Sequence, residues 1–324
     1  MTKTLFSICS ISHLSYFKTM LDSFLLHNQG YNIVLGLVDK VETDFNFSIN
    51  AEVTIVQIDQ LDIPDFNEIV NGYNPLELSC AMKPYVADFI FKKYNPDILL
   101  YLDTDILVFD NFDYVENLLN NNDIILTPHT FTEINDDNIP SERGFLKAGV
   151  FNAGFFMLKN TSNVLSFLNW WMLRMKNQCH IDFNEGMMLD QNWFNLVPYF
   201  FNKVGICDHL GYNFAYWNFH ERLLSKTGGN YIVNNNFNLV FIHISGFDIN
   251  HPTILSKHQN RFNLTDLNFV NDIYSAYVEK LIANNYFEYK EHNCVYSKKV
   301  IKSTGVLKIL NTILDNINFK LVKS

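Results

Sequence analysis

Short apolar runs alternate with segments of helical periodicity along the first 178 residues of the chain. Between the β-rich runs at 4–9 and 32–38, residues 14–28 place their apolar side chains at helical spacing, which predicts a β-α-β unit with two parallel strands. The same pattern predicts further strands at 52–57, 97–102, 123–127 and 150–158, and further helices at 78–94 and 163–178. This alternation is typical of an α/β protein with a Rossmann-like, doubly wound, mostly parallel sheet.

The pattern changes after residue 190, where residues 190–250 read as loops and short strands. No internal repeat and no Pro-, Gly- or Ser-rich linker interrupts the chain, so we expect one main domain over 1–270 and a helical extension over 271–324. The last thirty residues carry six lysines and a single acid, Asp315, and apolar side chains from Val306 to Ile317 fall on one helical stripe. Such a basic amphipathic helix either lies on an anionic membrane surface or packs on the protein with its lysines in solvent.

Composition narrows the functional class. Of the 324 residues, 48% are apolar and 18% are charged, which is enough to bury a large core. A net charge of −10 argues against nucleic-acid binding, because phosphates need cations to neutralise them. The five cysteines are dispersed and form no CxxC pair, as expected for reduced thiols in the cytoplasm.

The chain carries no obvious targeting segment. Its N-terminal apolar run is too short for a signal peptide, and no run of roughly 20 apolar residues is long enough to span a bilayer. We therefore expect a cytoplasmic protein, with peripheral contact at the inner face of the plasma membrane if the C-terminal helix binds lipid.

A pair of carboxylates follows the most apolar strand. The segment YLDTDIL places Asp103 and Asp105 directly after the strand at 97–102. Ligands of open α/β sheets bind beyond the carboxyl ends of the strands, and two carboxylates one residue apart can hold one divalent cation. An ion such as Mg²⁺ or Mn²⁺ held there bridges a diphosphate and stabilises charge on the leaving group. The alternative is a pair of solvated loop acids.

One other enzyme class carries a similar triplet. Haloacid-dehalogenase-type phosphatases place it after their first strand and need a later lysine followed by paired acids. Here the triplet follows a complete β-α-β unit, and no such lysine–acid motif is found. We therefore disfavour a phosphatase.

Several blocks of the sequence resemble GT-A glycosyltransferases of the family-8-like group, which includes glycogenin and glycosyltransferases of bacterial surface glycans. The blocks lie in the order expected for that group and together are far more specific than any one of them. They are AMKPYVADFIF at 81–91, YLDTDILVFDN at 101–111, FNAGFFMLKN at 151–160, LDQNWFNLVP at 189–198, GYNFAYWNFHER at 211–222, FIHISGF at 241–247 and LSKHQNRF at 255–262. The resemblance implies a GT-A fold and transfer of a hexosyl or N-acetylhexosaminyl group from a nucleotide-sugar.

The resemblance implies a metal site of three residues. Asp103 and Asp105 match the metal-binding DxD of the family, and His243 matches a histidine that supplies a third ligand. An imidazole ligand suits Mn²⁺ better than Mg²⁺, so Mn²⁺ is favoured and Mg²⁺ is the alternative. Without the aspartates, His243 would read as a core histidine at a strand end.

The resemblance also implies donor-binding and catalytic residues. Lys83 matches a basic residue that contacts the donor, and Asp190 and Gln191 match a catalytic pair below the anomeric carbon. The other implied donor-binding residues are Cys9, Ser10 and Asp39 for the base and ribose, Asn152, Ala153 and Gly154 for the sugar, Ser245, Gly246, Lys257 and His258 beside the diphosphate, and Asp103 itself. A UDP-sugar is the expected donor. The chain departs from the family where FDINHP follows Gly246, which leaves the diphosphate contact of Lys257 open.

A cluster of aromatic and amide side chains suits a carbohydrate acceptor, because rings stack on sugars and amides bind hydroxyl groups. Core packing is the alternative for its aromatic members. The cluster comprises Tyr212, Asn213, Tyr216, Trp217 and Asn218.

The expected reaction is metal-dependent transfer of a sugar to a glycan, a lipid-linked glycan or a protein, with retention of anomeric configuration. A catalytically inactive protein that binds a glycan or nucleotide is the main alternative. A nucleotidyltransferase is disfavoured, because the first strand and turn, SICSISHLS, contain no Gly-rich basic loop for a triphosphate.

Overall fold

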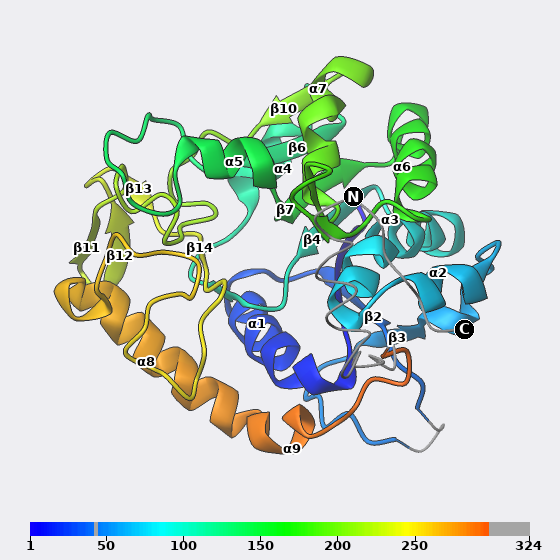
Figure 1. The fold of residues 1–324 in the computed structure, drawn as a ribbon, viewed down its shortest axis with the longest axis horizontal. Coiled ribbons are helices and arrows are strands. Elements are labelled where there is room, and N and C mark those ends of the chain that lie inside the picture. Colours follow the sequence, from blue (N-terminus) through cyan, green and yellow to red (C-terminus); the bar gives the residue numbers. More distant parts are fainter. Residues whose placement is uncertain (42–44, 298–324) are drawn as a thin grey trace, which may run out of the picture.

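The computed structural model describes residues 1–41 and 45–297, which Figure 1 shows arranged around a central sheet. Seven strands form this sheet in the order β10-β6-β7-β4-β1-β2-β3. Strand β7 runs antiparallel to both of its neighbours, and the other adjacent strands are parallel. The strands are β1 (Lys3–Cys9), β2 (Tyr31–Leu37), β3 (Thr54–Gln57), β4 (Ile98–Leu102), β6 (Ile124–Pro128), β7 (Phe151–Lys159) and β10 (Val204–Ile206).

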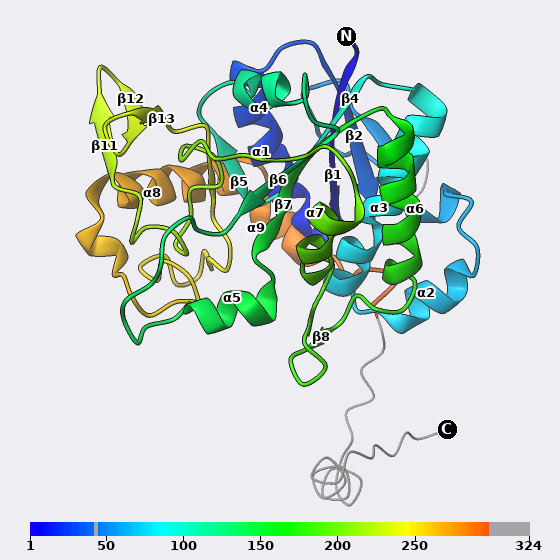
Figure 2. The same ribbon diagram turned by 90° about the horizontal axis from the view of Figure 1, so that it is seen from above.

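Helices cover both faces of the sheet, as Figure 2 shows from above. Successive residues of β4 point to opposite faces, so Leu99 and Tyr101 lie in one buried cluster and Leu100 and Leu102 in another. The first cluster includes residues of α2 (Phe66–Gly72), α3 (Pro75–Tyr94) and α6 (Ser162–Met175), and the second includes residues of α1 (Leu14–His27) and α4 (Asp113–Leu118). The predicted doubly wound, mostly parallel α/β sheet is confirmed.

Capping residues set the boundaries of α3. The Asn74 side chain accepts hydrogen bonds from two backbone N–H groups of the first turn, and Glu77 accepts one from Asn74 N at 2.9 Å. Pro75 fits the first helical position, where no backbone N–H is needed. The helix ends at Asn95, which adopts a left-handed conformation with φ 47°. It therefore begins before the predicted residue 78, and its middle turns bring Lys83 to the sheet.

A second group of elements packs beside the central sheet. Strand β5 (Ile106–Val108) follows β4 and pairs antiparallel with β14 (Phe241–His243). Helix α8 (Asn268–Ala283), orange in Figure 1, runs along this side and leads to α9 (Tyr286–Lys290). The remaining elements are α5 (Glu142–Ala148), α7 (Val197–Phe200), the hairpin of β8 (Ile181–Asp182) and β9 (Met187–Met188), and a small sheet of β11 (Leu224–Thr227), β12 (Asn230–Val233) and β13 (Phe237–Asn238).

The expected start of the C-terminal extension, residue 271, lies within helix α8. Helix α8 crosses the expected boundary at residue 270, and its residues Val270, Ile273 and Tyr274 share a buried cluster with Ile242 of β14. The boundary stays a prediction, and the basic stretch after Ser297 lies outside the described residues. Among helices within 1–41 and 45–297, none combines the length and apolar character needed to cross a membrane.

Candidate metal and donor site

Asp103, Asp105 and His243 lie together at the carboxyl end of β4. The aspartates follow Leu102, the last residue of β4, and His243 is paired with Ile106 in the β5–β14 ladder. His243 Nε2 lies 3.0 Å from Asp105 Oδ1 and 4.0 Å from Asp103 Oδ2. One ligand atom from each of these three side chains lies within 4.8 Å of the other two. The pairing of β5 with β14 therefore brings the predicted metal ligands together.

These side chains fit a divalent cation. The Asp103 and Asp105 side chains are 31% and 30% exposed, whereas the His243 side chain is 4% exposed. His243 Nδ1 lies 3.3 Å from Asn213 Oδ1, so a proton on Nδ1 can be donated there and Nε2 is left to bind a metal. Carboxylate oxygens with one imidazole nitrogen suit Mn²⁺, and the partly exposed aspartates can be reached from solvent.

Opposite charges hold the cluster together. Burial lowers the pKa of His243, but Asp105 and Asp103 outweigh this effect and hold the pKa above its ordinary value. Burial raises the pKa of Asp105, but His243 outweighs it, so the pKa of Asp105 is lowered. Below this raised pKa, a proton therefore competes with a metal ion for His243 Nε2.

Glycine at position 154 leaves room for these ligands. Asp103 N donates a hydrogen bond to Gly154 O at 2.8 Å, which holds β7 beside the cluster. A Cβ atom on Gly154 would lie 2.5 Å from His243 Cε1 and 2.7 Å from Asp103 Oδ2. The structure thus shows a steric reason for glycine in β7 that the sequence pattern did not suggest.

Lys83 lies between two carboxylates. Its Nζ atom is 2.9 Å from Asp190 Oδ2 and 3.4 Å from Asp103 Oδ1, and it donates a hydrogen bond to Ala153 O at 3.0 Å. Burial alone would lower the pKa of Lys83, but Asp103 and Asp190 raise it well above its ordinary value. The predicted donor-binding lysine is therefore a buried cation that lies between Asp190 and Asp103.

The Gln191 amide ties three neighbouring segments together. Its Nε2 atom donates to Ala148 O at 2.8 Å, and its Oε1 atom accepts from Asn152 Nδ2 at 3.1 Å and Ala153 N at 3.2 Å. Gln191 begins a 3-10 helix (Gln191–Leu196) directly after Asp190. The predicted catalytic pair thus lies beside the Asn152–Gly154 segment, and the roles of these residues in catalysis and sugar binding stay predictions.

The implied base and ribose residues lie at the ends of β1 and β2. Cys9 and Asp39 are almost fully buried. The Asp39 carboxylate accepts hydrogen bonds from Ile11 N at 3.4 Å and from Val295 N at 2.9 Å. The chain segment after α9 therefore reaches the end of β2 and engages Asp39. Ser10 Oγ lies 2.9 Å from the Ser12 hydroxyl in the turn after β1.

The loop after β14 brings the four implied diphosphate residues together. Lys257 N donates a hydrogen bond to Gly246 O at 3.0 Å. This bond joins the segment of Ser245 and Gly246 to the segment of Lys257 and His258. Gly246 has φ 72°, and a Cβ atom on it would lie 2.4 Å from His258 Cδ2. The Lys257 and His258 side chains are exposed, so both are free to meet a ligand.

The predicted acceptor cluster lies beneath the surface. Its five members are all buried, with relative exposures from 0% to 8%. Tyr212 packs edge-on against Phe112 and Phe241, so the alternative of core packing holds for this ring. Trp217 packs edge-on against His243, with ring centroids 5.1 Å apart. Asn218 Nδ2 donates to His129 O and Asn213 O. Of the cluster, Asn213 and Trp217 thus contact His243, and the acceptor role of all five residues stays a prediction.

Sequence reasoning missed Tyr101. Its hydroxyl donates a hydrogen bond to Asp103 Oδ1 at 2.5 Å, and its ring lies 4.7 Å below the Lys83 ammonium. The spacing of Tyr101 and Asp103 gives a signal, because side chains two residues apart on an extended chain point to the same face. The apolar run DILLYL predicts only a strand buried on both faces, so the Tyr101 hydroxyl is not recognised there as a partner of Asp103.

Comparison with known proteins gives distant similarities. No family model matches the chain. The uncharacterized protein YfnF of Bacillus subtilis (strain 168) is 25% identical over 215 residues, which cover 64% of this chain and 68% of YfnF.

The similar solved structures include three glycosyltransferases. GlyE of Streptococcus pneumoniae TIGR4 has a TM-score of 0.49 at 16% identity, over 94% of this chain and 66% of GlyE. Galactosyltransferase LgtC, solved with donor and acceptor sugar analogues, has a TM-score of 0.40 at 14% identity, over 65% of this chain and 75% of LgtC. The bifunctional WbbM has a TM-score of 0.44 at 15% identity, over 88% of this chain and 44% of WbbM. The chain thus spans less than two thirds of GlyE and less than half of WbbM, and similarities at this level assign it no activity.

Proposed function

We propose that the chain is a metal-dependent, GT-A-type glycosyltransferase of the family-8-like group, which moves a hexosyl or N-acetylhexosaminyl group from a UDP-sugar to an acceptor. The observation that carries the proposal is the Asp103–Asp105–His243 cluster at the end of β4, in which the two aspartate side chains are 31% and 30% exposed. The buried Lys83–Asp190 pair beside it supports the proposal, because positioned charges can orient a sugar next to a diphosphate. The sequence resemblance implies donor roles for the same residues.

The proposed roles follow the chemistry of each group. Asp103, Asp105 and His243 would hold Mn²⁺, or Mg²⁺ as the alternative, and the ion would stabilise negative charge on the diphosphate leaving group. Asp190, fixed by Lys83, binds donor hydroxyls, and Gln191 positions Asn152 and Ala153 through its two amide atoms. The nucleotide is proposed to contact the ends of β1 and β2 and the loops after β14, through Cys9, Ser10, Asp39, Ser245, Gly246, Lys257 and His258.

Retention of anomeric configuration is part of the proposal. The Asp190 carboxylate is 3% exposed and paired with Lys83 at 2.9 Å, which makes it a weak nucleophile. A front-face reaction, in which the leaving phosphate takes the proton of the attacking hydroxyl, needs no nucleophile from the enzyme. This arrangement therefore favours the front-face route over a covalent intermediate on Asp190.

The proposed acceptor is a glycan, a lipid-linked glycan or a protein. An acidic chain with net charge −10 fits a small nucleotide-sugar held through a metal better than a nucleic acid. We place the activity in the cytoplasm, with peripheral membrane contact through the basic C-terminal stretch as an additional proposal.

A panel of UDP- and GDP-sugars tests the proposal through nucleotide release with Mn²⁺ and with EDTA. We expect release from one donor that is lost in EDTA and in Asp105→Ala, and retained in the matched control Asp272→Ala on the exposed side of α8. A folded wild type that binds UDP with Mn²⁺ but releases no nucleotide from any donor would favour an inactive binding protein. Release of phosphate from p-nitrophenyl phosphate would favour a phosphatase.

A further inference from the structure

Tyr101 and Lys83 both contact the same oxygen of one proposed metal ligand. The Tyr101 hydroxyl donates a hydrogen bond to Asp103 Oδ1 at 2.5 Å, and Lys83 Nζ lies 3.4 Å from that oxygen. The second oxygen, Oδ2, lies 4.0 Å from His243 Nε2. Asp103 therefore turns Oδ1 towards the protein interior and Oδ2 towards the other metal ligands.

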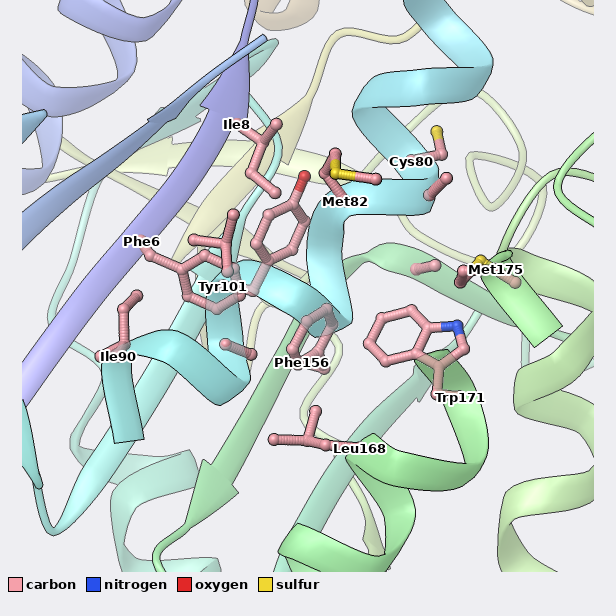
Figure 3. Close-up of a cluster of buried hydrophobic side chains, with 14 of the residues drawn as sticks. Phe6, Ile8, Cys80, Met82, Ile90, Tyr101, Phe156, Leu168, Trp171 and Met175 are labelled. Carbon is pink, nitrogen blue, oxygen red and sulfur yellow. The ribbon is translucent and has the colours of Figure 1, made fainter. Parts of the chain in front are cut away.

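Packing locks the Tyr101 ring in place. It is 1% exposed, stacks on Phe156 with centroids 4.8 Å apart, and packs against Phe6 at 4.9 Å. Figure 3 shows the ring between these two phenylalanines, with the hydroxyl oxygen at the edge of the apolar cluster near Ile8 and Met82. Because the ring cannot follow, any rotation of Asp103 that moves Oδ1 towards the metal leaves a buried hydroxyl without a partner.

Metal ions differ in how they use carboxylates. Ca²⁺ takes six to eight oxygen ligands and often binds a carboxylate through both oxygens, whereas smaller ions such as Mg²⁺ bind fewer ligands in stricter geometry. Ca²⁺ also prefers oxygen to nitrogen, and His243 supplies nitrogen. A carboxylate that offers a single oxygen therefore disfavours Ca²⁺ relative to Mn²⁺.

We propose that Tyr101 is a positioning residue that makes Asp103 bind the metal through Oδ2 alone, and that it thereby selects Mn²⁺ over Ca²⁺. The inference rests on the proposed metal site and goes beyond it by assigning ion selectivity to a side chain that does not touch the metal. Lys83 supports the same orientation but is also needed by Asp190, so Tyr101 is the contact specific to Asp103.

The test compares Mn²⁺ and Ca²⁺ affinities of the full chain by isothermal titration calorimetry, without nucleotide, for wild type and Tyr101→Phe. The variant keeps the ring and removes only the hydroxyl. We expect Mn²⁺ affinity to fall about tenfold, as for other groups that orient metal ligands, while Ca²⁺ affinity falls less or rises. The matched control is Tyr85→Phe, because the Tyr85 hydroxyl donates to Met172 O at 3.0 Å, away from the metal ligands. It should leave the ratio of the two affinities unchanged.

The outcomes separate this inference from the proposed function. A wild type that binds no Mn²⁺ would contradict the metal site itself. A wild type that binds Mn²⁺, with the same Mn²⁺/Ca²⁺ ratio in Tyr101→Phe, would overturn the selectivity role and leave the site intact. A crystal structure of the wild type with Mn²⁺ gives a check that needs no variant. We expect Asp103 to coordinate the ion through Oδ2 while Oδ1 accepts the hydrogen bond from Tyr101. Coordination of the ion by both oxygens would overturn the inference.

Discussion

The Lys83 ammonium lies 2.9 Å from Asp190 Oδ2, and both side chains are at most 4% exposed. The two residues come from different elements, α3 and the turn before the 3-10 helix at Gln191–Leu196. The same ammonium lies 3.4 Å from Asp103 Oδ1, so one cation compensates a carboxylate of the proposed metal site and a carboxylate of the proposed sugar site. Loss of this cation leaves two negative groups without their shared partner.

Lys83→Met should therefore destabilise the fold strongly. Removing one partner of a buried ion pair costs about 3–5 kcal/mol, because the remaining charge stays buried without compensation. Urea unfolding of wild type and variant measures this free energy. Lys92→Met is the matched control on the same helix, since Lys92 is 71% exposed and pairs with Asp88 one turn away. Such a surface pair contributes at most about 1 kcal/mol. Equal losses in the two variants would show that the Lys83 pairing contributes nothing beyond a surface contact.

Mn²⁺ binding should release a proton and strengthen with pH. Asp105 and Asp103 hold the pKa of His243 above its ordinary value despite burial, so below that pKa a proton competes with the metal for the imidazole. As pH rises through the pKa, affinity should increase by up to about tenfold per pH unit and then level off. Calorimetry in buffers of different ionisation enthalpy measures the proton release directly. In His243→Asn the release should disappear, and its persistence would assign the proton to another group.

Gly154→Ala should abolish metal binding with little change in secondary structure. The new methyl group would lie within 2.7 Å of both His243 Cε1 and Asp103 Oδ2, so one of these ligands has to move. Gly144→Ala is the matched control in α5, because its methyl group would meet no atom closer than 3.9 Å. Mn²⁺ titrations of both variants provide the measurement. Wild-type affinity in Gly154→Ala would show that the cluster tolerates displacement and that the close approach has no functional meaning.

Much of the fold was predictable because local patterns specify it. Strand β4 is buried on both faces, and a strand of this kind reads as the uninterrupted run ILLYL. Ligands of open sheets bind beyond the carboxyl ends of the strands, and the two aspartates follow such an end. In the structure both aspartates lie in the predicted cluster with His243. Short helices such as α2 and α4 were missed, since six or seven residues give too little periodicity to recognise.

Long-range contacts could not be predicted from spacing. His243 joins the aspartates only because β14 pairs with β5, and nothing in either segment specifies that pairing. The sequence resemblance supplied the histidine instead. The contact of Asp39 with Val295 could not be predicted either, because the backbone N–H that binds its carboxylate comes from a distant part of the chain. Every residue except proline has a backbone N–H, so the sequence does not show which one binds a given carboxylate.

Burial of the aromatic cluster was only partly foreseen. Tyr212, Tyr216 and Trp217 were expected to include acceptor platforms, yet each is at most 8% exposed. The same aromatic composition suits a sugar platform and a core, and only tertiary packing distinguishes them. Asn213 illustrates the difference, because its amide oxygen lies 3.3 Å from His243 Nδ1, where it can orient a proposed metal ligand.

The central claim is that Asp103, Asp105 and His243 hold a metal ion through which the protein binds the donor diphosphate. Calorimetric titration of UDP into the wild type, with Mn²⁺ and then with EDTA, tests it most directly, with Asp105→Asn as the variant. We expect UDP affinity to rise at least about tenfold with Mn²⁺ in the wild type and to be insensitive to Mn²⁺ in Asp105→Asn. UDP binding of equal strength in EDTA, or an unchanged Mn²⁺ effect in Asp105→Asn, would contradict it.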